Sequence, residues 1–379
     1  MGKGRAKNGF PCDSGTIGQG NPKKGFPRVP KSIKVGCDFG GMNTLVIAMN
    51  RMFDRSQYSY EFTGEKLPAS RALAVASGHE PRVWYEDVTL RDHADAPETH
   101  FYLFTPPCQS YSTNGKGLGI KDPRGQLVAI GVKYVAAKKP RAVMFEEVKG
   151  FLMGKNKKIA KGLTVALQKL GYVVKWAQKK SDDFGGATDR ERVFMVGIRN
   201  DCLRHKFKFP EPQAEQVRLR DVLDPFNPKT DKVCRLPKGV RQKQLAVMAF
   251  KDAMAAGSDP QVTPIAVDID CSVRYRAWGI DVAKTLTKAR GIQGGPWIST
   301  RGRRTTTDEL LRIQGFLPCE VPYKKAKISK AVVGQMLGDC VPVNLLGYIM
   351  AEVFWCAGLV NKKTKFKNRM IEFVGNDNV

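Results

Sequence analysis

One stretch near the start of the chain decides the fold: Ile33-Lys-Val-Gly-Cys-Asp-Phe-Gly-Gly-Met-Asn-Thr44. Its first half is a short apolar run typical of a buried strand, and its second half is a glycine turn. A helix-like stretch, 45–52, follows directly. A turn of this kind lets the backbone approach a ligand and points helix N–H groups at it. Many α/β proteins have such a turn, so the rest of the chain has to specify the ligand.

Short apolar segments alternate with amphipathic ones beyond this point. The apolar segments are 33–39, 58–63, 101–105, 142–145, 172–176 and 193–198, and helix-like stretches lie at 45–52, 68–77, 125–138 and 160–170. This alternation predicts an open, mostly parallel α/β sheet. Such sheets bind ligands beyond the carboxyl ends of their strands. The residues directly after each apolar segment are therefore the candidate site residues.

Changes in composition suggest five parts of the chain. We expect a disordered basic tail at 1–32, a larger α/β domain at 33–205, which would carry the ligand site, and a smaller, irregular, Pro-rich domain at 206–303. Regular patterning returns at 304–360, which we assign to the larger domain, and 361–379 is a basic C-terminal tail. The charge of the first tail suits nucleic-acid binding or an import signal, and a merely solvated tail is the alternative.

The most informative feature of the composition is its excess of positive charge: the formal net charge is +27. Crowded lysines and arginines repel one another unless a polyanion neutralises them, so the charge favours a nucleic-acid partner. An anionic membrane, or a basic protein kept soluble by its charge, is the alternative. The nine cysteines include no CxxC pair, which predicts a reducing compartment without disulfides or structural zinc. The apolar run 341–360 contains Asn344 and Glu352, so we interpret it as a buried helix and expect no membrane span.

Two acidic residues follow early segments of the predicted sheet. Glu65 comes about 25 residues after the glycine turn, a spacing typical of an acid that binds ribose hydroxyls. Asp87 is placed to accept a hydrogen bond from an adenine amino group. Either residue alone could be an ordinary surface acid. Together with the glycine turn they favour a cofactor that contains adenosine.

A cysteine follows the segment 101–105 in Thr105-Pro-Pro-Cys108-Gln-Ser110. The prolines fix the backbone, and a thiolate at the end of a strand could attack a substrate. A small buried hydrophobic residue is the alternative interpretation of Cys108. Glu146 and Glu147 end a later segment, and only one of these neighbours can face the cleft, because strand side chains alternate.

Arg190 and Arg192 lie two residues apart, so both can point the same way while Glu191 turns outward. We expect their two guanidinium groups to face the cleft, where they would suit phosphate and base oxygens.

The order of motifs resembles that of the C5-cytosine methyltransferase family over about 33–350. The matching stretches are Asp38-Phe-Gly-Gly-Met-Asn-Thr44, Pro107-Cys-Gln109, Lys121-Asp-Pro-Arg-Gly-Gln-Leu127, Phe145-Glu-Glu-Val-Lys-Gly150, the run from Asp183 to Arg199, Leu310-Leu-Arg-Ile-Gln-Gly-Phe316 and Gly334-Gln-Met-Leu-Gly-Asp-Cys-Val-Pro342. The resemblance implies a Rossmann-like sheet that binds S-adenosylmethionine (AdoMet), with 206–303 as the target-recognition domain.

The resemblance also implies a mechanism on a cytosine flipped out of double-stranded DNA. Cys108 attacks carbon 6, protonated Glu146 donates to ring nitrogen 3, and carbon 5 takes the methyl group from AdoMet. Arg190 and Arg192 hold the thiol loop and the base. The cofactor residues it implies, with Phe39 stacked on adenine, Glu65 on ribose and Asp87 on the adenine amino group, are Phe39, Gly41, Met42, Glu65, Asp87, Val88, Pro107, Leu127, Asp339 and Cys340.

A monomeric intracellular enzyme of DNA methylation, for example in restriction–modification, fits this resemblance. It would work in the cytoplasm or nucleoid in a prokaryotic or phage setting, or in the nucleus in a eukaryotic or viral one. No metal is implied. An RNA C5-cytosine methyltransferase on the same fold, and an inactive paralogue that only binds nucleic acid, are the alternatives.

Several positions depart from the family pattern: Asn43 and Thr44 stand for glycines, Glu147 for Asn, Thr188 for Gln, and Asp339-Cys340 for Asn-Ser. Two hypotheses remain open for Glu147. It could raise the pKa of Glu146, because two close carboxylates resist ionising together. The alternative, which we favour slightly, is that it turns away, for example onto Lys149, and has no electrostatic effect.

Overall fold

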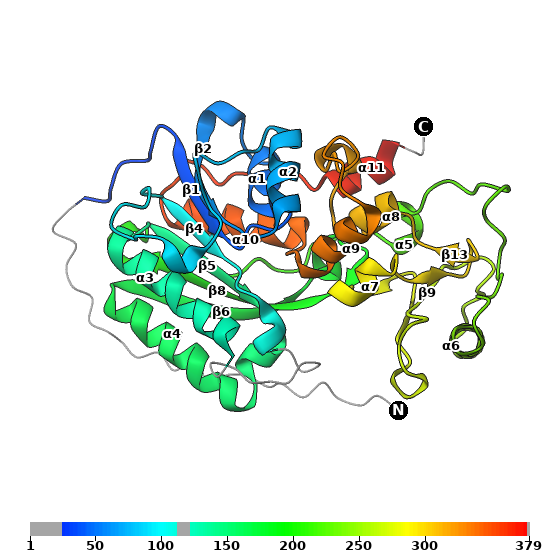
Figure 1. Cartoon of the computed structure of the whole chain (residues 1–379). Coiled ribbons are helices and arrows are strands. Elements are labelled where there is room, and N and C mark those ends of the chain that lie inside the picture. The colour runs from blue at the N-terminus through cyan, green and yellow to red at the C-terminus, as the bar shows by residue number, and fades with distance from the viewer. Residues whose placement is uncertain (1–24, 112–121, 377–379) are drawn as a thin grey trace.

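The structure, a computed structural model, describes residues 25–111 and 122–376. Figure 1 shows a larger lobe built on a sheet and a smaller lobe beside it. The sheet of the larger lobe has seven strands in the order β3-β2-β1-β4-β5-β8-β6. Their bounds are β1 Ile33–Asp38, β2 Tyr58–Gly64, β3 Val83–Tyr85, β4 Phe101–Phe104, β5 Ala142–Glu147, β6 Tyr172–Lys180 and β8 Glu191–Arg199.

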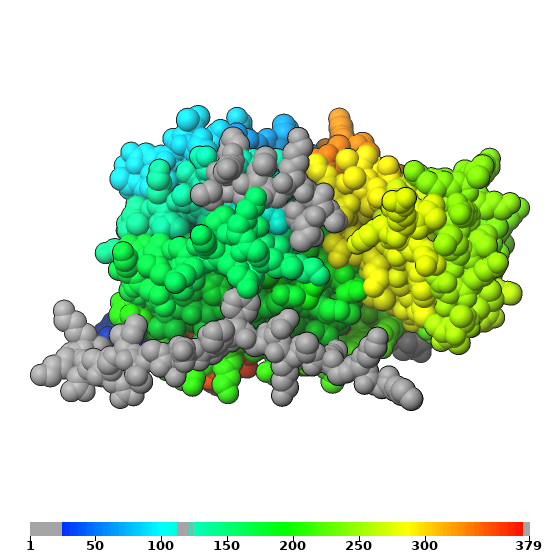
Figure 2. Space-filling view, turned by 90° about the horizontal axis from the view of Figure 1, so that it is seen from below, coloured from blue at the N-terminus to red at the C-terminus, as the bar shows by residue number. Residues whose placement is uncertain are grey.

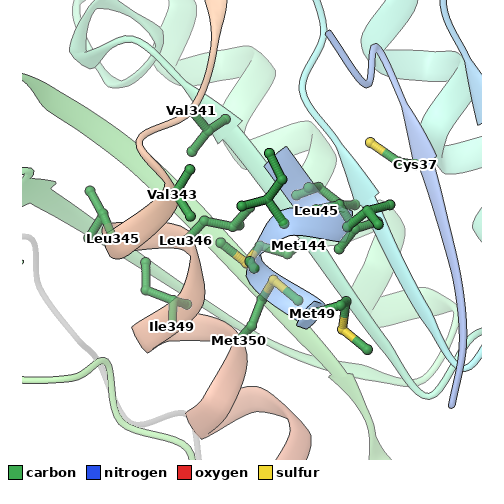
Figure 3. Close-up of a cluster of buried hydrophobic side chains, with 14 of the residues drawn as sticks. Cys37, Leu45, Met49, Met144, Val341, Val343, Leu345, Leu346, Ile349 and Met350 are labelled. Carbon is green, nitrogen blue, oxygen red and sulfur yellow. The ribbon is translucent and has the colours of Figure 1, made fainter. Parts of the chain in front are cut away.

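Helices cover both faces of this sheet. One face packs against α1 (Thr44–Asn50), α2 (Pro68–Ser77) and α10 (Val343–Cys356), and the other against α3 (Val128–Lys138) and α4 (Lys157–Lys169). Figure 3 shows the first of these cores, where Leu45 and Met49 of α1 meet Leu346 and Met350 of α10. The packing of these buried side chains holds α1 and α10 against each other and against the sheet.

The alternation along β5 determines which acid faces which layer. Ala142 and Met144 belong to the core under α1 and α10, whereas Val143 and Phe145 belong to the core under α3 and α4. Strand side chains alternate between faces. Glu146 and Glu147, the last residues of β5, therefore lie on opposite faces of the sheet.

The predicted fold class is confirmed, and each predicted strand and helix of the region 33–198 has a counterpart. Strand β8 alone runs antiparallel to both neighbours, β5 and β6, whereas the other neighbouring pairs are parallel. Because β8 is reversed, its first residues, and not its last, lie at the carboxyl edge of the parallel strands. Arg190 and Arg192 reach that edge for this reason. The short strand β3 was not predicted.

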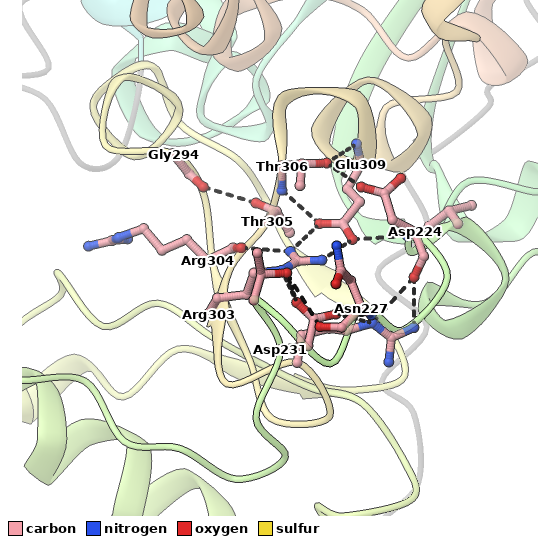
Figure 4. A network of polar contacts seen from close by, with 12 residues as sticks. Asp224, Asn227, Asp231, Gly294, Arg303, Arg304, Thr305, Thr306 and Glu309 are labelled. Carbon is pink, nitrogen blue, oxygen red and sulfur yellow. Dashed lines mark hydrogen bonds and ion pairs between the residues drawn. The ribbon is translucent and has the colours of Figure 1, made fainter.

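The smaller lobe contains an antiparallel sheet of four strands, β10-β9-β12-β13. Its strands and helices are β9 Ile265–Val267, β10 Trp278–Ile280, β12 Trp297–Ile298, β13 Arg303–Arg304, α5 Leu219–Val222, α6 Val240–Ala255 and α7 Lys288–Ile292. Figure 4 shows the ion pairs that tie this sheet to the returning chain. Arg303 binds Asp231 (2.7 Å) and Glu309 (2.9 Å), and both carboxylates are fully buried.

Two further contacts join the lobes. Strand β7 (Thr188–Asp189) pairs in parallel with β11 (Ala283–Lys284). Helix α7 packs on α9 (Lys330–Asp339), where a Cβ added to Gly291 would lie 1.8 Å from the carbonyl oxygen of Gly334. This approach of two helix backbones requires glycine on both sides.

The chain after the smaller lobe returns to the larger one through α8 (Thr307–Ile313), α9 and α10, and ends with α11 (Arg369–Asn376). The run 341–360 forms a buried helix, as expected. In the part of the chain that the structure describes, no single helix is long and apolar enough to cross a membrane. Helices α9 and α10, which meet at a bend of 41°, would together be long and apolar enough by length and composition alone. The expected disordered tail lies outside the described residues up to residue 24, and the C-terminal tail contains α11.

Candidate active site

The predicted site residues meet at the carboxyl edge of the sheet, where β1, β4 and β5 lie side by side. The residue after β4 joins two of these strand ends. The Thr105 hydroxyl donates to the carbonyl oxygen of Phe39 (3.1 Å), and its N–H donates to that of Asp38 (3.3 Å). The turn after β1 and the segment that carries Cys108 are thereby fixed to each other.

Cys108 begins a 3₁₀ turn, Cys108–Ser110, directly after the two prolines. The turn rests on Tyr111, whose hydroxyl donates to Gly125 (2.6 Å) and whose ring packs edge-on against Phe151 (4.8 Å). The pKa of the Cys108 thiol is raised to about 11: burial is the largest cause, Glu147 and Glu146 also raise it, and Arg192 and Arg190 act to lower it. The charges of the predicted residues Glu146, Arg190 and Arg192 therefore all act on this thiol, and so does that of Glu147.

Glu146 and Arg192 form an ion pair beside this thiol. Arg192 Nε lies 3.0 Å from Glu146 Oε1, and each side chain is about one tenth exposed. Burial raises the pKa of Glu146 above its ordinary value, although Arg192 and Arg190 act to lower it. Burial thus outweighs a direct salt bridge, and the carboxyl group retains its proton to a higher pH than an exposed glutamate.

Arg190 differs from our expectation that both guanidinium groups face the cleft. It is fully buried, and it donates to the carbonyl oxygens of Leu286 (2.8 Å), Gly338 (3.0 Å) and Cys340 (2.8 Å). Burial lowers its pKa to about 10, and the charge of Arg192 adds to this. Arg190 therefore joins the smaller lobe to the end of α9, and these hydrogen bonds leave little of it for a phosphate.

Glu147 differs from both hypotheses. It is 1% exposed, it accepts from the N–H of Val148 (2.8 Å), and its Oε1 has no partner among the described residues. Lys149 pairs with Glu191 instead (3.4 Å). Burial raises the pKa of Glu147 well above its ordinary value, and the charge of Glu146 raises it too. The two carboxylates therefore interact, and the rise caused by their interaction falls on Glu147 and not on Glu146, where the first hypothesis placed it.

The turn after β1 has an unusual backbone. Phe39 and Asn43 adopt the left-handed conformation (φ 63° and 59°), as does Gly41 (φ 51°). Asparagine tolerates this conformation better than other non-glycine residues, which explains how Asn43 can stand where the family has glycine. Phe39 has no such tolerance, and strain of this kind gathers at functional sites. The ring of Phe39 is half-buried, and it lies at the start of the turn, directly after β1.

Glu65 closes this turn from β2. Its carboxylate accepts from the N–H of Gly41 (3.0 Å) and from that of Leu67 (2.9 Å). The first of these bonds joins Glu65 to a residue 24 positions earlier in the chain. The glycine turn and Glu65 therefore lie in contact, as the spacing predicted.

Asp38 has partners that the sequence did not reveal. Its fully buried carboxylate accepts two hydrogen bonds from Arg91 (2.7 and 2.6 Å) and one from the Tyr102 hydroxyl (2.5 Å). The guanidinium group of Arg91 also lies over the rings of Phe62 and Tyr134, at 5.0 and 5.2 Å from their centres. This buried cluster fixes the end of β1. No local signal could identify it, because Arg91 is 53 residues from Asp38.

Three other predicted cofactor residues lie near this turn. Asp87 accepts from the N–H and hydroxyl of Thr89 and pairs with Lys66 (2.7 Å), so its carboxylate already has partners. Val88 is buried against Gly64, where an added Cβ would lie 2.2 Å from its side chain. The side chain of Met42 is in the core, which leaves only its backbone for a ligand.

The remaining predicted residues lie on the side of Cys108. Pro107 precedes the cysteine, and Leu127 ends a 3₁₀ turn, Pro123–Leu127, that packs against the Cys108 turn. Cys340 is buried, and the charges of Arg190 and Glu146 act on its thiol. Asp339 is exposed and lies 3.4 Å from Lys288 of α7. No described residues gather as a metal site of three or more His, Cys, Asp or Glu.

The turn suits AdoMet by the chemistry of its groups. The side chains predicted for it are an aromatic ring, a fixed carboxylate and a second acid, from Phe39, Glu65 and Asp87, and Gly41 has space beside it: a Cβ there would meet only the Phe39 carbonyl, at 3.9 Å. The buried amide nitrogen of Asn43 has no partner among the described residues, so the turn retains an unused donor. The carboxylate of Asp87 is less available to a ligand, because it already forms an ion pair with Lys66.

Comparison with known proteins gives one consistent family. The model of C-5 cytosine-specific DNA methylases matches residues 76–355, about three quarters of the chain. The chain is 29% identical over 318 residues to the type II methyltransferase M.NgoPII of Neisseria gonorrhoeae, covering 78% of this chain and 90% of the relative. It is 27% identical over 289 residues to M.FnuDI of Fusobacterium nucleatum, covering 72% and 81%.

A solved structure supports the fold. The Dnmt2 methyltransferase of S. pombe superposes with a TM-score of 0.59 at 15% identity, covering 85% of this chain and 98% of that one. The sheet order, the residues gathered at its carboxyl edge and the family match over most of the chain agree: this chain belongs to the C-5 cytosine-specific DNA methylase family, whose methyl donor is AdoMet.

Proposed function

We propose that the chain transfers a methyl group from AdoMet to carbon 5 of cytosine in DNA, with Cys108 as the nucleophile. One observation carries the assignment of roles: the charges of Glu146, Arg190 and Arg192 all act on the half-buried Cys108 thiol at one edge of the sheet. This edge is where a sheet of this kind binds its ligands.

Cys108 loses its proton and its sulfur bonds to carbon 6 of the flipped cytosine. The ring electrons move toward carbon 5, and Glu146 gives its proton to nitrogen 3. AdoMet would supply the methyl group as an electrophile: its methyl–sulfur bond breaks as carbon 5 bonds to the methyl carbon, and the sulfonium leaves as a neutral thioether. A base then removes the proton from carbon 5, the bond between carbon 6 and the Cys108 sulfur breaks, and nitrogen 3 returns its proton to Glu146. The raised pKa of Glu146 suits the donor role.

The two arginines have different roles in this proposal. Arg192 orients Glu146 through the ion pair at 3.0 Å, and its charge lowers the cost of forming the thiolate. Arg190 is a positioning residue, because its hydrogen bonds hold the chain at Leu286 against the end of α9. The pKa of the thiol is about 11 with both arginine charges in place, so without them the thiolate would form less readily still.

The cofactor site consists of the turn after β1 and its neighbours. We assign Phe39 to the adenine ring and Glu65 to the ribose, with the backbone of Gly41 and Met42 beside them. Val88, Pro107 and Leu127 contribute the walls, and Asp87 can accept from the adenine amino group once Lys66 moves aside. Asp339 and Cys340 at the end of α9 complete the site from the returning chain.

The smaller lobe supplies the surface for target recognition. Figure 2 shows it, in yellow-green and yellow, beside the larger lobe on one face of the molecule. The connection between β9 and β10 carries Tyr275, which is 66% exposed, between the exposed Arg274 and Arg276. Exposed aromatic and arginine side chains contact bases and phosphates in DNA complexes, so we assign this segment to the DNA.

Methyl transfer from labelled AdoMet to duplex DNA and to RNA distinguishes the three functions. A DNA enzyme labels the duplex, and nuclease digestion releases 5-methylcytosine. Label in RNA alone would establish the RNA methyltransferase instead, and binding of both without label would establish the inactive paralogue. The type II relatives favour a restriction–modification role inside the cell, acting as a monomer on DNA in the cytoplasm or nucleoid of a prokaryote.

A further inference from the structure

A second charged cavity lies at the opposite edge of the central sheet. It has a volume of about 160 Å³, and it is lined by Glu98, Thr99 and six basic residues: Lys34, His100, Lys138, Lys139, Arg141 and Arg199. The catalytic residues lie at the carboxyl ends of β1, β4 and β5, whereas Lys34, His100 and Arg141 lie where these strands begin. The cavity is therefore separate from the catalytic site.

The backbone places four of these basic residues in a row. His100 N–H donates to the Lys34 carbonyl (2.8 Å), Ala142 N–H to His100 (3.1 Å) and Arg199 N–H to Arg141 (2.9 Å). Neighbouring strands lie about 5 Å apart. Backbone hydrogen bonds thus hold the four basic residues next to one another on four adjacent strands. Because they belong to the sheet and not to loops, they cannot easily move apart.

The protein neutralises only part of this row. Arg199 pairs with Asp201 (2.7 Å), but Arg141 donates only to the carbonyl oxygens of Gly358 (3.2 Å) and Arg28 (2.8 Å). Among the described residues, neither Lys34 nor Lys139 has a carboxylate within ion-pair distance. Burial lowers the pKa of Arg141, and the charges of Arg199 and Arg204 lower it further. Unbalanced positive charge in a cavity favours an anion.

His100 adds a neutral donor. Burial and the charges of Arg141 and Lys34 lower its pKa to about 4, so the ring is neutral at pH 7. Its Nδ1 accepts the backbone N–H of Lys34 (3.0 Å), so the remaining proton is on Nε2, which is then a donor. A ring N–H beside lysine and arginine cations is a donor set that suits phosphate oxygens.

We propose that this cavity binds phosphate groups, and that it is a second nucleic-acid contact away from the catalytic cleft. The basic tail supports nucleic acid as their source. Arg141 and Arg204 hold the backbone at Arg28 and Pro27, so the described part of the chain begins near the cavity, and the sequence before it, 1–24, has five basic residues and one acid. Free phosphate or pyrophosphate has the same chemistry, and the experiment separates the two sources.

The test compares Lys34→Thr/Lys139→Asn with the matched pair Lys158→Gln/Lys161→Gln, which removes the same charge from the exposed side of α4. Asparagine suits position 139, where φ is 46°, and threonine suits a strand, so both variants should fold. Calorimetry with pyrophosphate reports on the cavity, and the salt dependence of binding to a long duplex reports on DNA. Methylation of a short duplex checks the catalytic site.

We expect the cavity pair to weaken pyrophosphate binding at least tenfold and to reduce the slope of log K against log salt by about 1 to 2 more than the control pair. Methylation of the short duplex is unchanged. Loss of pyrophosphate binding with an unchanged slope would overturn the nucleic-acid contact and leave a small phosphate as the ligand. Equal pyrophosphate binding by both pairs and the unsubstituted protein would overturn the site itself.

Discussion

Replacing Glu147 by glutamine tests how the catalytic thiol is controlled. The substitution retains the acceptor for the Val148 N–H and the shape of the buried side chain, but removes the group that ionises. The pKa of Cys108 is raised from its ordinary 9.0 to about 11, with burial as the largest cause and Glu147 as the next. The net rise corresponds to about 2.7 kcal/mol against the thiolate. Removing the charge of Glu147 should therefore increase the thiolate population, by about tenfold for each pKa unit that this charge contributes.

The effect should depend on pH, because the pKa of Glu147 is itself raised well above its ordinary value. While Glu147 is protonated it carries no charge, and the variant should react like the unsubstituted protein. Above the pKa of Glu147 the buried carboxylate repels the thiolate, so Cys108 should react more slowly in the unsubstituted protein than in the variant. We therefore expect the two rate–pH profiles to coincide at low pH and to separate as pH rises.

Alkylation of Cys108 by iodoacetamide between pH 5 and 10, followed by mass spectrometry of the peptide, measures this. Cys108→Ser gives the background from other thiols, and Glu191→Gln is the matched control, because that carboxylate pairs with Lys149 on the surface. Profiles that coincide at every pH would refute the electrostatic role of Glu147. A loss of reactivity at every pH would show that Glu147 only supports the local structure.

The other predictions concern the rest of the site and the tail. Asp38→Asn leaves Arg91 buried without its counter-ion and should cost about 3–5 kcal/mol in the free energy of unfolding by urea, and a loss under 1 kcal/mol would contradict the buried pair. Asp339→Asn should narrow the affinity ratio between cationic AdoMet and its neutral product by only about two- to fivefold, since Lys288 already pairs with the exposed carboxylate, and calorimetry showing an unchanged ratio would remove Asp339 from the site. Deleting residues 1–24 should flatten the salt dependence of DNA binding, and an unchanged slope would make the tail a bystander.

The strands of the larger lobe could be predicted from sequence because each is an apolar run between turn residues. β1 and the glycine turn after it are the clearest case, and the spacing from Gly41 to Glu65 placed both in one site. β3 was missed because three half-buried residues carry no pattern that differs from a loop. The antiparallel direction of β8 was also not visible, since strand direction depends on how the connection before it crosses the sheet.

Side-chain partners were predicted less well than positions. Strand alternation correctly placed Glu146 and Glu147 on opposite faces, but it could not show that the second face is buried under Tyr111 and Phe151. The spacing of Arg190 and Arg192 predicted that both side chains point to the same side of the strand. Whether a guanidinium group there faces a cleft or binds three carbonyl oxygens depends on segments about 100 residues away or more. Such partners are set by tertiary packing, which local sequence does not encode.

The identity of the nucleophile is the central claim, and one measurement tests it most directly. Bisulfite sequencing of DNA from cells that express the protein, compared with cells that express Cys108→Ser at equal level, reports 5-methylcytosine at each site. We predict methylation at a defined sequence with the unsubstituted protein and none with the variant, because a neutral hydroxyl is a far poorer nucleophile than a thiolate. Methylation retained by a folded Cys108→Ser protein would contradict the account.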